Sequence, residues 1–242
     1  MSDSRRFSIP AATVSAALAL IVMVGAMPIA AQQPSQAPKA TADAPAVYKP
    51  PLRGAPGGRV GGGTRGTGQE PAFVLSVLAP NHTGLTVSEQ PSLFWFISSA
   101  SSYPVELTLV DPGKTDPLIE LKVNPPVKPG VHRVSLKDHN VRLAPGVSYQ
   151  WYVAVVPDSN RRSKDILAGG SIERVASPAE LTTKLSQASK SQVPALYAEA
   201  GMWYDALGAI GDLIEQSPQD TALVNQRSAL LRQVGLPDAR DN

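Results

Sequence analysis

The stretch from Leu143 to Val153, LAPGVSYQWYV, decides the fold. Its Pro-Gly pair marks a tight turn, and the residues from Tyr149 to Val156 form the strongest strand-like run of the chain. Because successive side chains of a strand point to opposite faces, Tyr149 and Trp151 share one face. We therefore expect a strand that leaves a turn and buries two large aromatic side chains.

This order of residues is similar to the beginning of strand F in fibronectin type III and related Ig-like domains. The resemblance implies a tyrosine corner, in which the Tyr149 hydroxyl bonds to an upstream backbone group. At such a strand position we expect Trp151 to fill the core together with Trp95. Core packing is favoured over the alternative, in which Trp151 stacks on a ligand.

Further short runs, separated by Pro, Gly and Asn turns without a helical pattern, predict an antiparallel β-sheet structure. Residues 93–97 are apolar on both faces, which indicates a central strand. The other runs lie at 73–78, 105–109, 118–123 and 131–136. Together they predict an Ig-like, fibronectin III-like β-sandwich over residues 71–176.

After Ser177 the apolar period becomes helical. Ser177, Pro178 and Glu180 have the spacing of an N-cap, a first helical residue and a capping box. A second helix is expected to start near Pro194, and a third to run from Asp220 to the turn signals after Gln233.

The spacing from Gly201 to Pro218 is similar to the second half of a tetratricopeptide unit, with Trp203 at the aromatic position. One such unit does not stand alone, so the helices of residues 177–242 must pack on the sandwich or on a partner. Trp203 and Tyr204 are the candidates for a partner face. The expected fold class is mainly β with α: the sandwich followed by a C-terminal tetratricopeptide-like helical hairpin.

Residues 1–31 have the pattern of a secretory signal peptide, with paired arginines, an uncharged apolar run over residues 11–27 and small residues before the expected cleavage after Ala31. The general secretory route is favoured over the twin-arginine route, because Phe7 follows the arginine pair directly. We expect a periplasmic or secreted protein with no stable membrane anchor after cleavage. The chain has no cysteine, which excludes disulfides and thiolate metal sites.

Residues 32–47 are rich in Pro, Ala, Gln and Thr without apolar periodicity, which predicts a disordered linker. Residues 48–70 form an arm rich in Arg, Gly and Pro. Within it, residues 61–66 read Gly-x-Gly-x-x-Gly, but no strand precedes them, so dinucleotide binding is not expected.

The arm carries three candidate contacts to an anion or a partner, Arg53, Arg59 and Arg65. An anionic glycan or lipid is the ligand class that they would suit, and solvated arginines are the alternative. Because the arm also contains apolar side chains, we expect it to lie against the sandwich. Its arginines would then pair with carboxylates such as Glu106 or Asp111.

Catalytic and metal-binding patterns are poor in this sequence. His82, His132 and His139 are too far apart, and exposed loop histidines are the favoured interpretation. The Gly-x-Ser-x-Gly elbow is missing. A formal net charge of +2 does not favour nucleic-acid binding. We expect no cofactor, no metal and no enzymatic activity.

Four marks, at residues 48–66, 91–95, 149–151 and 197–207, together resemble a family of exported bacterial proteins known as domain of unknown function 928, common in cyanobacteria. The resemblance implies that the arm belongs to the domain, and it brings no activity, cofactor or catalytic residue. We expect a non-catalytic cell-envelope interaction module whose partner is another envelope protein. The alternative is a carbohydrate-binding module or an enzyme with a site near Trp95, Trp203 or Tyr204.

Overall fold

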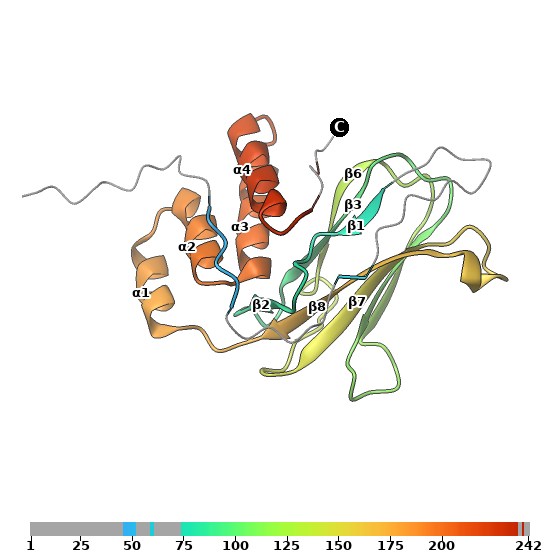
Figure 1. Cartoon of the computed structure of the whole chain (residues 1–242), viewed down its shortest axis with the longest axis horizontal. Coiled ribbons are helices and arrows are strands. Elements are labelled where there is room, and N and C mark those ends of the chain that lie inside the picture. Colours follow the sequence, from blue (N-terminus) through green and yellow to red (C-terminus); the bar gives the residue numbers. More distant parts are fainter. Residues whose placement is uncertain (1–45, 52–58, 61–73, 237–238, 240–242) are drawn as a thin grey trace, which may run out of the picture. The chain divides into compact units, whose positions relative to one another are not determined.

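The computed structural model describes residues 46–51, 59–60, 74–236 and 239, which form two β-sheets and four α-helices (Figure 1). The smaller sheet has the strand order β1 (Leu75–Val77), β3 (Ser92–Ile97) and β6 (Gly130–Ser135). The larger sheet has the order β2 (Gly84–Thr86), β8 (Ile166–Arg174), β7 (Ser148–Val155), β4 (Val105–Val110) and β5 (Ile119–Val123). Neighbouring strands are antiparallel, except that β2 runs parallel to β8.

Strand β7 follows the prediction from the sequence. Its side chains alternate between buried and half-buried positions, with Tyr149, Trp151 and Val153 turned inward. The Tyr149 hydroxyl accepts a hydrogen bond from the Ala144 backbone N–H at 2.9 Å, which confirms the predicted bond to an upstream backbone group. The turn before β7 is therefore tied to the strand that it starts.

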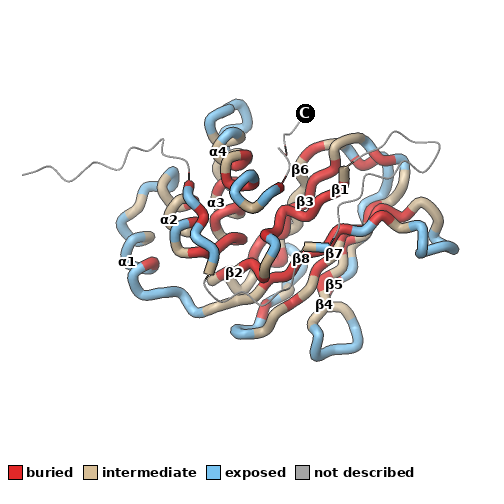
Figure 2. The backbone as a smooth tube through the Cα atoms, viewed as in Figure 1, coloured by how far each residue is buried: buried red, intermediate tan, exposed pale blue. Residues whose placement is uncertain are grey.

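The two sheets share one apolar core. Every residue of β3 is buried, as expected for a central strand, and Trp95 from β3 joins the same core cluster as Trp151 from β7. Both indole side chains are almost completely buried, which confirms that Trp151 packs in the core. Figure 2 shows the buried residues running along β3, β8 and β7.

Two strands were not predicted. β2 is only three residues long, and its sequence Gly-Leu-Thr lies in a segment that reads as a turn. β8 contains Gly169 and Gly170, which weaken the strand signal of the surrounding residues. The residues around Glu173 therefore end a long strand that pairs with both β7 and β2.

Four helices follow the sheets: α1 (Ala179–Gln187), α2 (Val193–Glu199), α3 (Trp203–Gln216) and α4 (Thr221–Arg232). The predicted cap of the first helix is wrong. Pro178 has extended backbone angles and takes the N-cap position itself, so the Ser177 hydroxyl lies near Thr182 at 3.0 Å instead. Glu180 pairs with Lys184 at 2.8 Å rather than with the backbone before the helix.

The second predicted helix is divided in two. It starts at Val193 with Pro194 in its first turn, as expected, but ends after about two turns. Gly201 has a φ of +78°, a conformation that L side chains rarely adopt, and α3 begins two residues later.

Helix α4 begins and ends as its sequence predicts. The Asp220 side chain caps its first turn by accepting a hydrogen bond from the Ala222 N–H at 2.9 Å. At its end the Leu236 N–H donates to the Leu231 carbonyl and the Gly235 N–H donates to the Arg232 carbonyl, both at 3.1 Å. With Gly235 at a φ of +68°, this is a Schellman motif.

Candidate functional site

Helix α3 is fastened to both sheets by its first two side chains. The Trp203 indole N–H donates to the Leu78 carbonyl at 2.8 Å, next to β1. The Tyr204 hydroxyl donates to the Ser171 carbonyl of β8 and accepts from the Trp151 indole N–H of β7, both at 2.9 Å. Trp203 and Tyr204 are buried, so neither side chain presents an exposed face, and the prediction that they contact a partner stays a prediction.

Asp205 is a third α3 side chain that bonds to the sheet region. Its carboxylate accepts from the Val87 N–H at 2.9 Å, just after β2, and also bonds to Thr86 and Ser88. Burial raises the pKa of Asp205 to about 6, and these hydrogen bonds oppose that rise. The start of α3 is thus held at a fixed position beside the sheets.

Residues 46–51, which we name the groove segment, run in an extended conformation along α2 and past the end of α4 (Figure 1). The side-chain amide of Gln233, directly after α4, bonds to backbone groups of the segment on either side of Val47. Its Oε1 accepts from the Tyr48 N–H at 2.8 Å, and its Nε2 donates to the Ala46 carbonyl at 2.7 Å. The Lys49 N–H donates to the Ala198 carbonyl at the end of α2, at 3.0 Å.

The Tyr48 side chain fills a pocket beneath the segment. Its ring meets Trp203 edge to face, with the ring centroids 5.0 Å apart, and its hydroxyl lies 2.9 Å from His82 Nε2. Burial raises the pKa of Tyr48 and lowers the pKa of His82, so both groups are neutral near pH 7. Only 7% of Tyr48 is exposed, whereas 54% of its neighbour Val47 is.

Close approach of the backbone to Gly201 completes the groove. A Cβ atom at this position would lie 2.8 Å from the Lys49 carbonyl oxygen. The same glycine that separates α2 from α3 therefore gives the groove segment room to pass.

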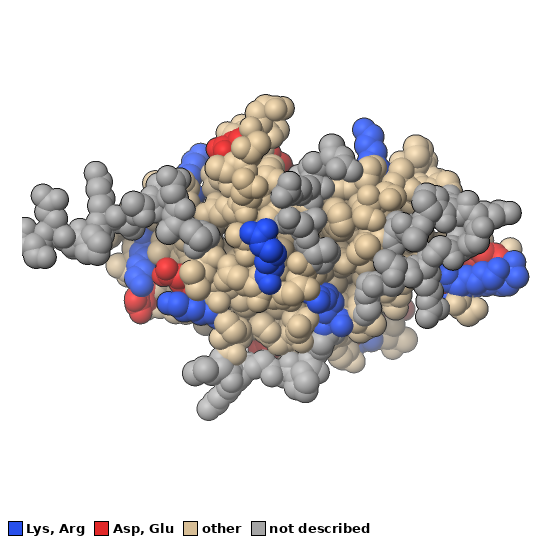
Figure 3. Space-filling view, turned by 45° about the horizontal axis from the view of Figure 1, so that its top comes forward, with Lys and Arg blue, Asp and Glu red and all other residues tan. Residues whose placement is uncertain are grey.

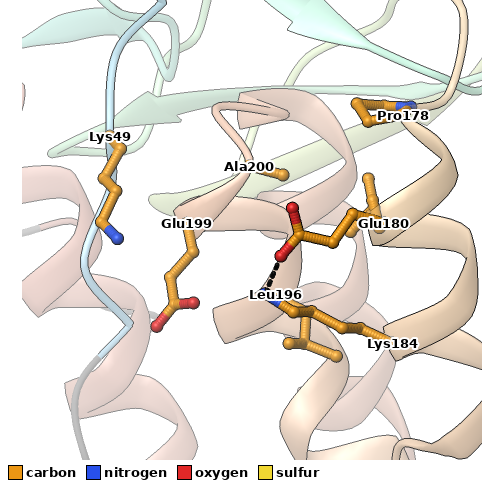
Figure 4. A pocket seen from close by; sticks show the side chains of 8 residues that line it. Lys49, Pro178, Glu180, Lys184, Leu196, Glu199 and Ala200 are labelled. Carbon is orange, nitrogen blue, oxygen red and sulfur yellow. Dashed lines mark ion pairs between the residues drawn. The ribbon is translucent and has the colours of Figure 1, made fainter.

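Two open pockets flank the groove segment. One of about 280 Å³ lies between the segment, α1 and α2, and Figure 4 shows Glu199 between Lys49 and the paired Glu180 and Lys184. The other, of about 360 Å³, lies on the side of His82 and the α4 end. It is lined by Tyr48, Pro50, Asn81, His82, Gln233, Val234 and Gly235. The segment thus leaves room on both sides for larger side chains.

Arg59 is the one predicted arginine contact within the described residues, because Arg53 and Arg65 lie outside them. Its guanidinium donates to the carbonyls of Ala79, Val234 and Gly235 at 3.3–3.5 Å. In the described part of the chain no carboxylate pairs with it.

The carboxylates expected to receive arm arginines pair with other residues. Glu106 pairs with Arg162 at 2.7 Å, and Asp111 pairs with Lys114 at 3.8 Å. Val60, the next arm residue, forms a two-bond bridge to Gly169 of β8, with N–H to carbonyl distances of 2.9 and 3.0 Å. At this point the arm lies against the sandwich as predicted, whereas the groove segment lies against the helices as well.

The remaining polar candidates do not converge. His132 stacks on Trp95 with the ring centroids 4.0 Å apart, and its Nε2 bonds to the Lys128 carbonyl. Within the described ranges no three His, Asp or Glu side chains gather as metal ligands. On the face drawn in Figure 3 the basic side chains are scattered among neutral surface. None of the helices described here has the length and apolar content to cross a membrane.

No pattern in the sequence indicates that the groove residues come together. Gln233 reads as an ordinary residue at a helix end, and its partner Tyr48 lies 185 positions away. Local spacing finds residues that one element brings together, and here three separate elements meet. Only the aromatic character of Tyr48 in a linker-like stretch pointed to an ordered contact.

A comparison with protein families matches residues 60–242 to one described as Domain of Unknown Function (DUF928). A search of curated proteins found no match. The family match begins at Val60, so most of the stretch at residues 48–66, one of the four marks, lies outside it. His82, Ala198, Gly201, Trp203 and Gln233, which form the groove, all lie inside it. With three quarters of its residues matched, the chain belongs to the family of unknown function DUF928.

Proposed function

We propose that the protein is an exported, non-catalytic interaction module of the cell envelope that binds a polypeptide partner. The observation that carries the proposal is the groove, which holds an extended chain through main-chain hydrogen bonds to Gln233 and Ala198. Main-chain bonding combined with a pocket for an alternate side chain is how extended peptides are recognised. The signal-like residues 1–31 support the envelope location.

In this proposal the sandwich is an Ig-like scaffold and the helices are a tetratricopeptide-like hairpin docked on it. The tyrosine bond before β7 supports the first part. The aromatic residue at the start of α3 supports the second, although here it binds the sandwich instead of a further repeat. The bonds from three α3 side chains to the sheets give the groove a rigid wall, and rigid elements make precise binding sites.

The carbohydrate alternative requires an exposed aromatic surface. The aromatic side chains near which such a site was expected, Trp95, Trp203 and Tyr204, are buried. No observation on the described residues favours a sugar site over the groove.

Site-specific photo-cross-linking of the mature chain in envelope extracts tests the proposal. The cross-linking amino acid replaces Asn81, which lines one of the pockets beside the groove, in one variant and Val123 on the edge strand β5 in the matched control, since both side chains are exposed. We expect one protein, identified by mass spectrometry, to cross-link at position 81 and not at 123. Glycan-array binding without any protein cross-link at position 81 would contradict the proposal.

A further inference from the structure

The groove segment is bound as a separate ligand would be bound. Its partners are side chains and backbone groups from α2, α4 and the loop after β1, and none of these is near it in the chain. Residues 52–58 connect it to Arg59, and Ala46 and Tyr48 are buried while Val47 and Lys49 face outward. This alternation is the pattern of an extended peptide in a recognition groove.

Each position of the segment meets a different demand. Ala46 is 1% exposed, so only a small side chain fits there. Tyr48 enters the Trp203–His82 pocket and offers a polar tip to the imidazole. Lys49 and Glu199 lie side by side at one open pocket (Figure 4), and the carboxylate there favours a basic residue. Pro50 and Pro51 hold the chain extended at little entropic cost.

We propose that this groove is a binding site for an extended segment of another protein with the pattern small–any–Tyr–basic–Pro–Pro, and that residues 46–51 occupy it in cis as a competitor. This inference rests on the proposed function and specifies its partner. The residues that form the groove lie within the family match at 60–242, whereas the occupant lies before it. The two flanking pockets leave space for a ligand with larger side chains than the cis segment carries.

The cis segment sets the size of the expected effect. A tethered ligand acts at an effective concentration on the order of millimolar. For a short peptide with an intrinsic Kd of about 0.1 mM, competition at that concentration weakens apparent affinity about tenfold. Substitutions within residues 46–51 should therefore free the groove for the peptide, while the residues that line the groove stay unchanged.

The experiment titrates a fluorescein-labelled peptide of residues 44–52, APAVYKPPL, into the full chain and follows anisotropy. Two variants release the occupant: Tyr48→Ala empties the pocket, and Ala46→Arg places a long charged side chain where none fits. The matched control is Val47→Arg, which adds the same charge at an exposed neighbour. We expect the two release variants to bind the peptide about tenfold more tightly than the wild type and the control.

Two further peptides test which ligand side chains the groove recognises. Replacing the tyrosine of the peptide by alanine should abolish binding to every variant. Replacing its lysine by glutamate should weaken binding two- to fivefold, because exposed charges interact weakly, and added salt should remove the difference.

Equal peptide affinity for the wild type and both release variants would overturn the proposal. So would unfolding of both variants in circular dichroism, because the segment would then be part of the core. A dimer that forms in the wild type and is lost in Tyr48→Ala would also overturn it, since the occupant would be a second copy. If the peptide does not bind while position 81 still cross-links to a protein, only this inference is lost. If the cross-link fails and the peptide binds, the proposal of an envelope partner is lost.

Discussion

Replacing Tyr204 by phenylalanine removes one oxygen atom that serves two buried hydrogen bonds. The Trp151 indole N–H loses its acceptor, and the Ser171 carbonyl loses a donor from α3, both formerly at 2.9 Å. A buried polar group left without its partner costs about 1–3 kcal/mol. Since the ring itself stays and the site is fully enclosed, we expect the free energy of unfolding to fall by about 2–4 kcal/mol.

Urea unfolding of the mature chain, followed by tryptophan fluorescence, measures this change at an unchanged slope with urea concentration. The matched control is Tyr152→Phe, on the same strand as Trp151, whose half-buried hydroxyl has no hydrogen bond among the described residues. The control should change stability by less than about 0.5 kcal/mol. If Tyr204→Phe lowered the free energy of unfolding no more than its control does, the hydroxyl would not hold α3 to the sheets.

Four other outcomes follow from the same structure. Trp151→Ala should lower the free energy of unfolding by about 3–5 kcal/mol, as truncation of a buried large aromatic does, and an unchanged melting temperature would contradict its burial. The pKa of Asp205 in the folded state is about 6, above the ordinary value of 3.8. The side chain therefore takes up a proton preferentially in the folded state, and the stability gained from this proton is lost as the pH rises through about 6. The wild type should therefore lose about 2–3 kcal/mol relative to Asp205→Asn between pH 4 and 7, and a pH-independent difference in urea unfolding would contradict the raised pKa. Hydrogen exchange should be slowed at the Lys49 and Val60 amides, which donate to Ala198 and Gly169, and exchange at the random-coil rate would return the arm to a linker. N-terminal sequencing of the native protein should begin at Gln32, and a sequence beginning at Met1 or Ser2 would contradict cleavage.

The sheets and helices were predictable where one local pattern settled the outcome. Strand β7, the buried β3 and the capped α4 all follow from alternation, apolar runs and turn residues within a single element. Strand β8 was missed because its glycines dilute the pattern, and its strand conformation comes from pairing with β7 along its whole length.

The candidate site was less predictable, because its geometry depends on tertiary contacts. An aromatic pair at the start of a helix suggests an exposed face or a buried anchor equally well until the sheet is present. In this chain Trp203 and Tyr204 are buried anchors of α3, and the Gln233 side chain binds the groove segment. Arg59 likewise binds carbonyl groups because the loops around it present no carboxylate among the described residues.

The bond between Tyr48 and Gln233 spans 185 positions, which has a consequence for how the chain acquires its structure. During synthesis the segment emerges first, and the glutamine that holds it follows 185 positions later. Contacts of such high sequence separation form late, because a long loop must close first. Until the ribosome has passed Gln233, Tyr48 lacks this partner, and the nascent stretch is open to chaperones and proteases. Ordering of the segment therefore reports that α4 has been made and has folded.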